Sequence, residues 1–493
     1  MTPSAFVSCL CLSSLTTGDS ARSGSNPLQL SSAETVLGAY IFHRHGDRTS
    51  KSTPPTVLTD LGYSEVFARG SYYHSRYIAA GSPSQILGIE TDIVKLSQLS
   101  VSSPSDSVLQ NSATGWLQGL YPPVGSSANQ TLRNGTTVDV PLNGYQLIPI
   151  SLLSSGSGSE NSAWLQGSTG CLKAELSSNE YFSSDSYNSL LASTADFYKS
   201  LAPMINSTFT SSQMNFKNAY TIYDYLNVGS IHNSTTEYPA LDALTPDLLH
   251  QLLVLANIHE YNLAYNASDP VRAIAGAVLA GQVVQALNET ITSGGQSKLG
   301  VQFGSYATFL SYFGLAQLPS LGPEWEGMPD YASSMVWELV TNSSTSSGFP
   351  PASEISVRFL FHNGTSASSP EPTAYPLFGQ SSTVLSWSDF VDHTNKFAIS
   401  SQSQWCQACG NTTGVCAGAG DASTSSSSPA ASSVSSSSGG ISRAVAGVIG
   451  AMVTLGVILG VEALILVVGG FRLTKKRAVV GNAAVATATA EKA

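Results

Sequence analysis

The feature that most constrains this chain is an apolar run that ends in a charged cluster near the N-terminus. Residues 36–42 are almost entirely apolar, and Arg44-His45-Gly46-Asp47-Arg48 follow closely. This pattern predicts a buried strand ending in a functional loop, because the sheet fixes the strand end and the loop presents side chains. Two guanidinium groups match phosphate oxygens with forked hydrogen bonds, and a neutral imidazole between them can attack phosphorus. Gly46 allows the backbone to approach a bound anion closely.

A solvated basic turn is the alternative interpretation of this motif. We disfavour it, because an imidazole beside two cations is electrostatically costly unless an anion binds there. The spacing Arg-His-Gly-x-Arg at a strand end resembles the signature of the histidine phosphatase superfamily, in particular its acid phosphatase and phytase branch. The resemblance implies that His45 is the phosphorylated nucleophile and that Arg44 and Arg48 clamp the phosphate. We assign Gly46 and Asp47 to substrate binding, with Asp47 orienting one of the arginines, and we expect no cofactor and no metal ion.

One expected phosphate ligand is missing from the sequence. Residues 102–123 resemble the family's second phosphate-binding segment, in which a strand ends in Ser or Thr and an arginine follows. Here Ser107 or Val108 stands in the place of that arginine. The basic residue Lys95 lies too early on the predicted strand, residues 93–101, to be an obvious substitute.

The family's acid motif is also missing. The resemblance places a His-Asp pair after a strand that begins at Leu299, where this chain has Gly304-Ser305-Tyr306-Ala307. A later pair, His362-Asn363, could be a damaged form of this motif, but its place on the last predicted core strand argues against that, and the N-glycosylation sequon at Asn363 favours an exposed turn. Without the arginine and the acid, turnover is expected to be weak or narrow in substrate, since an acid typically contributes 10²–10⁴-fold and one electrostatic donor about 10²–10³-fold.

The composition indicates a secreted or lumenal chain. Charged residues make up 11% of the 493 residues, the net charge is −11, and no basic run suits nucleic acid, so nucleic-acid binding is set aside. Sequons for N-glycosylation are spread through the body of the chain. The candidate acceptors are Asn129, Asn134, Asn206, Asn233, Asn266, Asn288, Asn342, Asn363 and Asn411.

The two ends of the chain predict its topology. Residues 5–15 resemble a short signal-peptide core that lacks a positive n-region. Residues 444–468 are long and apolar enough to span about 30 Å of hydrocarbon, and the basic residues that follow predict a cytoplasmic C-terminus. A GPI signal is the alternative, but such a signal ends in its apolar run. We therefore expect a single-pass type I protein of the plasma membrane or the secretory pathway.

Within the predicted span, Gly456 and Gly460 have the spacing of a small-xxx-small helix contact, which allows self-association through that helix. Four cysteines remain outside the predicted signal, an even number that suits an oxidising compartment. Two structural disulfides are expected among Cys171, Cys406, Cys409 and Cys416, and the pairing cannot be deduced from spacing.

The predicted fold is α/β. The resemblance implies a phosphoglycerate mutase-like sheet flanked by helices, with an inserted, mainly helical cap. A helix capped by Thr59 or Asp60 should follow the charged loop, with Glu65 where the family usually has glutamine, and residues 143–150 look like a further strand. The predicted divisions are a signal (1–20), a phosphatase-like ectodomain (30–416, cap about 125–262), a serine-rich stalk (417–440), a transmembrane helix (444–468) and a cytoplasmic tail (469–493).

Two functions from different classes follow. In the first, the chain is a surface phosphomonoesterase of the histidine acid phosphatase type that forms a phosphohistidine at His45. In the second, it is a catalytically silent surface glycoprotein that binds phosphate or has a structural role. The two are distinguished by whether another carboxylate lies within reach of a phosphate on His45.

Overall fold

The computed structural model describes residues 34–153, 170–232 and 241–417. The predicted signal, nearly all of the stalk, the transmembrane helix with Gly456 and Gly460, the tail and Asn233 lie outside these residues and stay predictions. Within the described ranges, one helical segment, Pro270–Thr292, has the length and apolar composition needed to cross a membrane. Of its most apolar stretch, 67% is buried inside the protein.

An eight-stranded sheet forms the core, in the order β10-β8-β7-β1-β6-β2-β5 with β9 paired to β8. The central strand β1 lies between parallel β6 and antiparallel β7, and every residue in it after Thr35 is buried, which explains its continuous apolar run. The strands are β1 (Thr35–Arg44), β2 (Leu99–Pro104), β5 (Ser151–Leu153), β6 (Leu299–Gly304), β7 (Ser334–Thr341), β8 (Ser356–His362), β9 (Thr373–Ala374) and β10 (Val384–Ser386).

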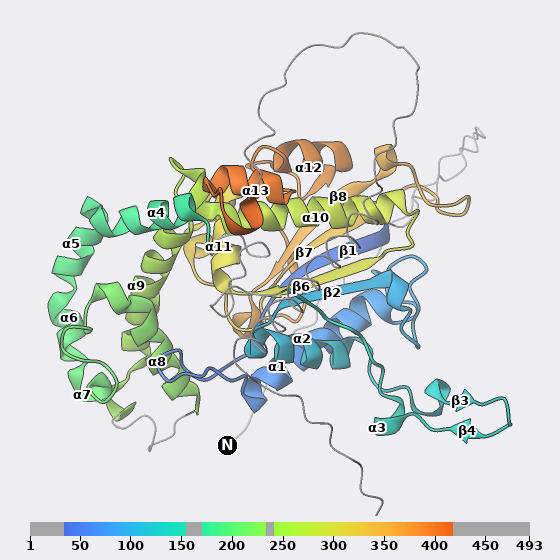
Figure 1. The fold of residues 1–493 in the computed structure, drawn as a ribbon, viewed down its shortest axis with the longest axis horizontal. Helices are drawn as coiled ribbons and strands as arrows, with labels where there is room; N and C mark the ends of the chain where they lie inside the picture. The colour runs from blue at the N-terminus through green and yellow to red at the C-terminus, as the bar shows by residue number, and fades with distance from the viewer. Residues whose placement is uncertain (1–33, 154–169, 233–240, 418–493) are drawn as a thin grey trace, which may run out of the picture. The chain divides into compact units, whose positions relative to one another are not determined.

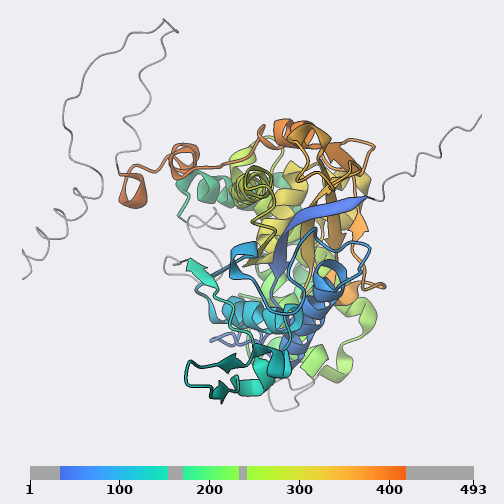
Figure 2. The same ribbon diagram turned by 90° about the vertical axis from the view of Figure 1, so that its right-hand side faces the viewer.

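Helices cover both faces of this sheet (Figures 1 and 2). On one face, α1 (Asp60–Tyr73) and α2 (Ser107–Leu120) pack Val66 and Trp116 against β1, β6 and β7. On the other, α10 (Ile274–Thr292), α11 (Tyr306–Leu315) and α12 (Trp387–Thr394) form a second core cluster with Phe42 of β1. This arrangement confirms the predicted α/β fold class.

A set of helices lies beside the sheet, at the left of Figure 1, and all but the first of them share a separate apolar core. These helices are α4 (Leu172–Glu180), α5 (Asp185–Ser193), α6 (Ala195–Ser200), α7 (Ala202–Ile205), α8 (Ala219–His232) and α9 (Pro246–Ala264). We refer to α4–α9 as the cap. The preceding segment is different, since it contains the β3–β4 hairpin (Gln130–Thr131 and Thr137–Val138), the turn α3 (Pro141–Gly144) and the edge strand β5.

Two disulfides confirm the expectation for the four cysteines and give the pairing. Cys171, which precedes α4, is bonded to Cys409 of α13 (Gln402–Cys409), and Cys406 is bonded to Cys416. The first bond therefore joins the start of the cap to the C-terminal helix of the described chain.

Three local predictions are wrong. The strand expected over residues 93–101 begins only at Leu99, because a 3₁₀ turn precedes it and the Gln98 side chain bonds to backbone groups at Gly88 and Glu90. Residues 145–150 form no strand, and Gln146 instead bonds to the backbone at Asp92, Val94 and Pro122. His362 is buried rather than exposed, and its ring contacts the backbone of Ser369 and Gly364.

Candidate functional site

The charged cluster forms the loop at the carboxyl end of β1, as predicted. Arg44 is the last residue of the strand, and its N–H donates to Ser333 O over 2.8 Å. The next residues are tied to the neighbouring elements, since His45 O accepts from Ala332 N (2.9 Å) and Gly46 N donates to Ser112 Oγ of α2 (3.3 Å). The central strand and two flanking segments therefore fix the backbone of this loop.

Two glycines allow the loop to lie directly on the first turn of α1. A Cβ atom on Gly46 would lie 2.2 Å from Gly62 O, and one on Gly62 would lie 2.0 Å from Asp47 O. Both clashes would be with backbone atoms, which cannot shift without a large cost in free energy. Gly46 was predicted to allow close approach of an anion, and the close approach in this structure is to the backbone of α1. The predicted N-terminal capping of helix α1 is confirmed at Thr59, because Thr59 Oγ1 accepts from Gly62 N.

The His45 ring presents one defined nitrogen for chemistry. His45 Nδ1 lies 2.8 Å from the carbonyl oxygen of Gly46, which can only accept, so Nδ1 carries the proton in the neutral ring. This assignment from the hydrogen bond leaves the lone pair on Nε2. The whole residue is buried, and the centroid of the Tyr331 ring lies 5.7 Å from that of the imidazole.

Arg44 is a buried cation without an anionic partner in the described part of the chain. Its side chain is 6% exposed, Nη1 donates to Pro329 O, and the Nε atom is buried with no hydrogen-bond partner. The guanidinium lies 4.8 Å from the centroid of Tyr331 and 5.4 Å from that of Tyr306. Aromatic faces stabilise a cation weakly compared with a carboxylate, so this charge favours binding of an anion.

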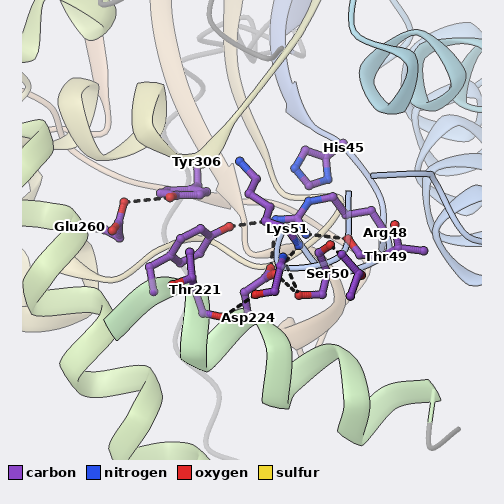
Figure 3. A network of polar contacts seen from close by, with 12 residues as sticks. His45, Arg48, Thr49, Ser50, Lys51, Thr221, Asp224, Glu260 and Tyr306 are labelled. Atoms are coloured by element: carbon purple, nitrogen blue, oxygen red, sulfur yellow. Dashed lines mark hydrogen bonds and ion pairs between the residues drawn. The ribbon is translucent and has the colours of Figure 1, made fainter. Parts of the chain in front are cut away.

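Arg48 is neutralised by a carboxylate from the cap. Its Nη2 atom lies 3.0 Å from Asp224 Oδ1 of α8, and both side chains are almost completely buried. The same guanidinium donates to Tyr220 Oη and to Thr49 O, each over 2.9 Å. Asp224 Oδ2 accepts from Ser50 Oγ (3.0 Å) and Lys51 N (2.8 Å), and Figure 3 draws these contacts around Asp224.

The structure places other residues where the family's third arginine and His-Asp pair were expected. Ser107 and Val108 begin α2, where Asp106 caps Val108 N and Leu109 N, and Lys95 is exposed. At the His-Asp position, Ser305 precedes α11 and Tyr306 begins it. The Tyr306 hydroxyl donates to Glu260 Oε2 of α9 over 2.8 Å, as Figure 3 shows.

Asp47 makes contacts other than those predicted. Its Oδ2 atom accepts from Thr59 Oγ1 (2.5 Å) and lies 2.6 Å from His232 Nε2 at the end of α8. Its backbone N–H donates to Glu65 Oε2 of α1 over 2.8 Å. Asp47 therefore joins the loop to α1 and to the cap.

A cavity of about 1100 Å³ opens between the cap and the carboxyl end of the sheet. Arg44, Glu65, Asp330 and Tyr331 line its core side. Burial raises the pKa of Glu65 to about 7, and the carboxylates of Asp47 and Asp330 add to the rise, while the Asp47 N–H and Arg44 oppose it. Glu65 is thus a carboxyl group that keeps its proton to near-neutral pH, and it is hydrogen-bonded to the backbone N–H of Asp47 in the predicted catalytic loop. The sequence indicated this group only by a glutamate at position 65, where the resemblance implies glutamine.

The other carboxylates near the loop already have strong donors. Asp330 accepts from Tyr331 N, Thr365 Oγ1 and Ser366 Oγ. Asp224 pairs with Arg48, and Glu260 accepts from Tyr306. Among the described residues, no group of three or more His, Cys, Asp and Glu side chains is arranged to hold a metal ion.

Comparisons with known proteins agree with this fold. A family model described as "Histidine phosphatase superfamily (branch 2)" matches residues 51–362, which begins three residues after Arg48. No curated protein sequence matches. Among solved structures, the phytase of Klebsiella sp. ASR1 is similar with a TM-score of 0.51 at 11% identity, over 74% of this chain and 96% of that one. An apo phytase of Hafnia alvei has a TM-score of 0.50 at 12% identity, over 78% of this chain and 99% of that one.

The Arg48–Asp224 pair can be tested through stability. The change Asp224→Asn keeps the shape of the side chain but leaves the buried Arg48 charge without its partner, so we expect a loss of about 3–5 kcal/mol in the free energy of unfolding. Urea denaturation measures this loss. The same change at Asp196, which forms an exposed pair with Lys199, serves as the control and should have almost no effect. Equal losses in the two variants would contradict the role given to Asp224.

Proposed function

Because the chain belongs to branch 2 of the histidine phosphatase superfamily, we propose that it hydrolyses phosphomonoesters through a phosphohistidine at His45. The family supports phosphomonoester hydrolysis as the reaction class. The observation that carries the proposal is the position of Arg44, a buried guanidinium without an anionic partner among the described residues, directly beside the histidine at the end of β1.

The reaction proceeds in two steps. His45 Nε2 attacks phosphorus, a P–N bond forms, and the P–O bond to the leaving group breaks. Water then attacks the phosphohistidine, the P–N bond breaks, and phosphate and neutral His45 are restored. Arg44 stabilises the charge on the transferring oxygens, with a smaller contribution from Arg48, whose charge is shared with Asp224.

Glu65 serves as the proton donor for the leaving oxygen in this proposal. It lines the cavity beside Arg44, and its Oε2 atom accepts from Asp47 N, two residues after the nucleophile. Two other carboxylates that line the cavity near Arg44, Asp330 of the core side and Asp224 of the cap, are occupied by donors. Glu65 therefore takes the place of the His-Asp pair, from α1 rather than from the end of β6.

The competing function is a catalytically silent protein that binds phosphate or has a structural role. Two observations favour it: His45 is completely buried behind Tyr331, and Arg48 is already paired with Asp224. The Tyr331 ring also lies next to both side chains that the reaction would use, His45 and Arg44. A direct assay separates the two functions.

The first test is hydrolysis of p-nitrophenyl phosphate by the full-length chain between pH 4 and 8. We expect His45→Ala and His45→Asn to fall to the uncatalysed background, because both remove the nucleophilic nitrogen. His74→Ala, directly after the end of α1 and outside the cavity, should retain wild-type rates. Thermal melting of all variants checks that they fold. A wild-type rate equal to background would favour the silent function.

A second test addresses the proton donor. Glu65→Gln should lower kcat by about 10²-fold for an alkyl phosphate, whose leaving group needs a proton, and far less for p-nitrophenyl phosphate. Because Glu65 is protonated below its pKa of about 7, wild-type kcat for the alkyl ester should fall as pH rises through that value. This dependence should disappear in Glu65→Gln and persist in Glu289→Gln, an exposed control on α10. Equal losses for both esters would exclude Glu65 as the acid.

For localisation, we propose a single-pass type I protein with the described residues outside the cytoplasm. The apolar residues 444–468, the basic residues after them and the sequons support this topology. Asn134, Asn206, Asn288 and Asn342 are exposed and can accept glycans. We expect a mobility shift after N-glycosidase treatment and protection of a C-terminal tag from external protease in intact cells. A cleavable tag or an unglycosylated chain would contradict this topology. Self-association through Gly456 and Gly460 stays a prediction.

A further inference from the structure

The residues that line the cavity beside Arg44 indicate which kind of substrate it binds. We propose that it binds phosphomonoesters whose organic group is an apolar chain, and that it disfavours polyphosphorylated substrates. For turnover this inference rests on the proposed function, but binding can be tested without it.

The charges that line the cavity favour a single phosphate group. Arg44 is the only arginine or lysine among the described lining residues. The lining carboxyl groups are more numerous and lie on several elements: Glu65, Asp224, Glu324, Glu326 and Asp330. A substrate with several phosphates needs a cation for each group it buries. Glu324, Glu326 and Asp330, which have no cationic partner among the described residues, would instead repel the additional phosphates.

Much of the cavity wall that the cap contributes is apolar. Leu249, Leu253, Val254 and Ile258 follow one side of α9, and Ile231 of α8 and Leu61 of α1 add to this surface. Four of these side chains, Leu61, Ile231, Val254 and Ile258, are 36–43% exposed although they are large and apolar. Solvent-exposed apolar side chains gathered in one cavity mark a ligand-binding surface more often than a structural one.

The two features lie in the same cavity and define an amphiphilic ligand. The phosphate binds Arg44 at the core side, and the apolar chain extends along α8 and α9, which Figure 1 shows beside each other in the cap. The volume of about 1100 Å³ is far larger than a phosphate group alone requires. An apolar chain bound along this wall would displace water from the cavity, which would strengthen the electrostatic effect of Arg44.

The decisive experiment measures binding with phosphonates, which the enzyme cannot hydrolyse because they contain a P–C bond. Isothermal titration calorimetry on the full-length chain compares methylphosphonate, octylphosphonate and inositol hexakisphosphate. We expect octylphosphonate to bind at least tenfold more tightly than methylphosphonate, since each buried methylene group adds to the affinity. Inositol hexakisphosphate should bind no more tightly than inorganic phosphate.

A matched pair of variants locates the effect. Val254→Asp places a charge in the apolar wall and should abolish the preference for the octyl chain. Val138→Asp makes the same change on the β3–β4 hairpin, outside the cavity, at a residue of similar exposure (45% against 42%), and should leave the preference unchanged.

The outcomes separate this inference from the proposed function. Equal affinity for the two phosphonates, loss of the preference in both variants, or tightest binding of the hexakisphosphate would overturn the inference, whether or not the chain hydrolyses phosphate esters. A preference for the octyl chain without any hydrolysis would support the inference and contradict the proposed function.

Discussion

The buried ion pair between Arg48 and Asp224 is the interaction on which the geometry of the site depends. It joins the loop after the central strand to helix α8 of the cap, and its 3.0 Å contact is almost completely shielded from water. Because breaking one partner of such a pair leaves an uncompensated buried charge, the cap and the sheet are energetically coupled at this point. Because of this pair, the two arginines have different roles. Arg48 holds the cap, and Arg44 keeps its charge for a ligand.

The contact between Gly46 and Gly62 is a second constraint on the same loop. With no side chain on either residue, the loop rests on the first turn of α1, and this contact brings Glu65 within hydrogen-bonding distance of Asp47 N. The cap therefore positions Arg48, and α1 positions the acid. The two groups that support catalysis in our proposal come from opposite sides of the loop.

The sequence predicted the parts of the fold that local patterns determine. The run before Arg44 is apolar without alternation because β1 is buried on both faces, and Thr59 caps α1 as the sequence indicated. It could not predict the partners of the site residues, since Asp224, Tyr306 and Tyr331 reach Arg44 and Arg48 from distant positions in the chain. The sequence also suggested a strand at residues 143–150. In the structure, the side chain of Gln146 instead forms hydrogen bonds with backbone groups of other segments.

The residues that differ from the family signature all leave the site with little positive charge. In our proposal, the start of α2 supplies no arginine to the site, and Tyr306 stands where the resemblance implied an acid, with its ring near Arg44. A site with one uncompensated guanidinium and two aromatic rings neutralises little negative charge, so a ligand with a single phosphate matches it better than a polyanion. The apolar side chains of α8 and α9 then supply the binding energy that additional cations would supply to a polyphosphate. In this chain, the loss of charge and the gain of apolar surface favour the same kind of ligand.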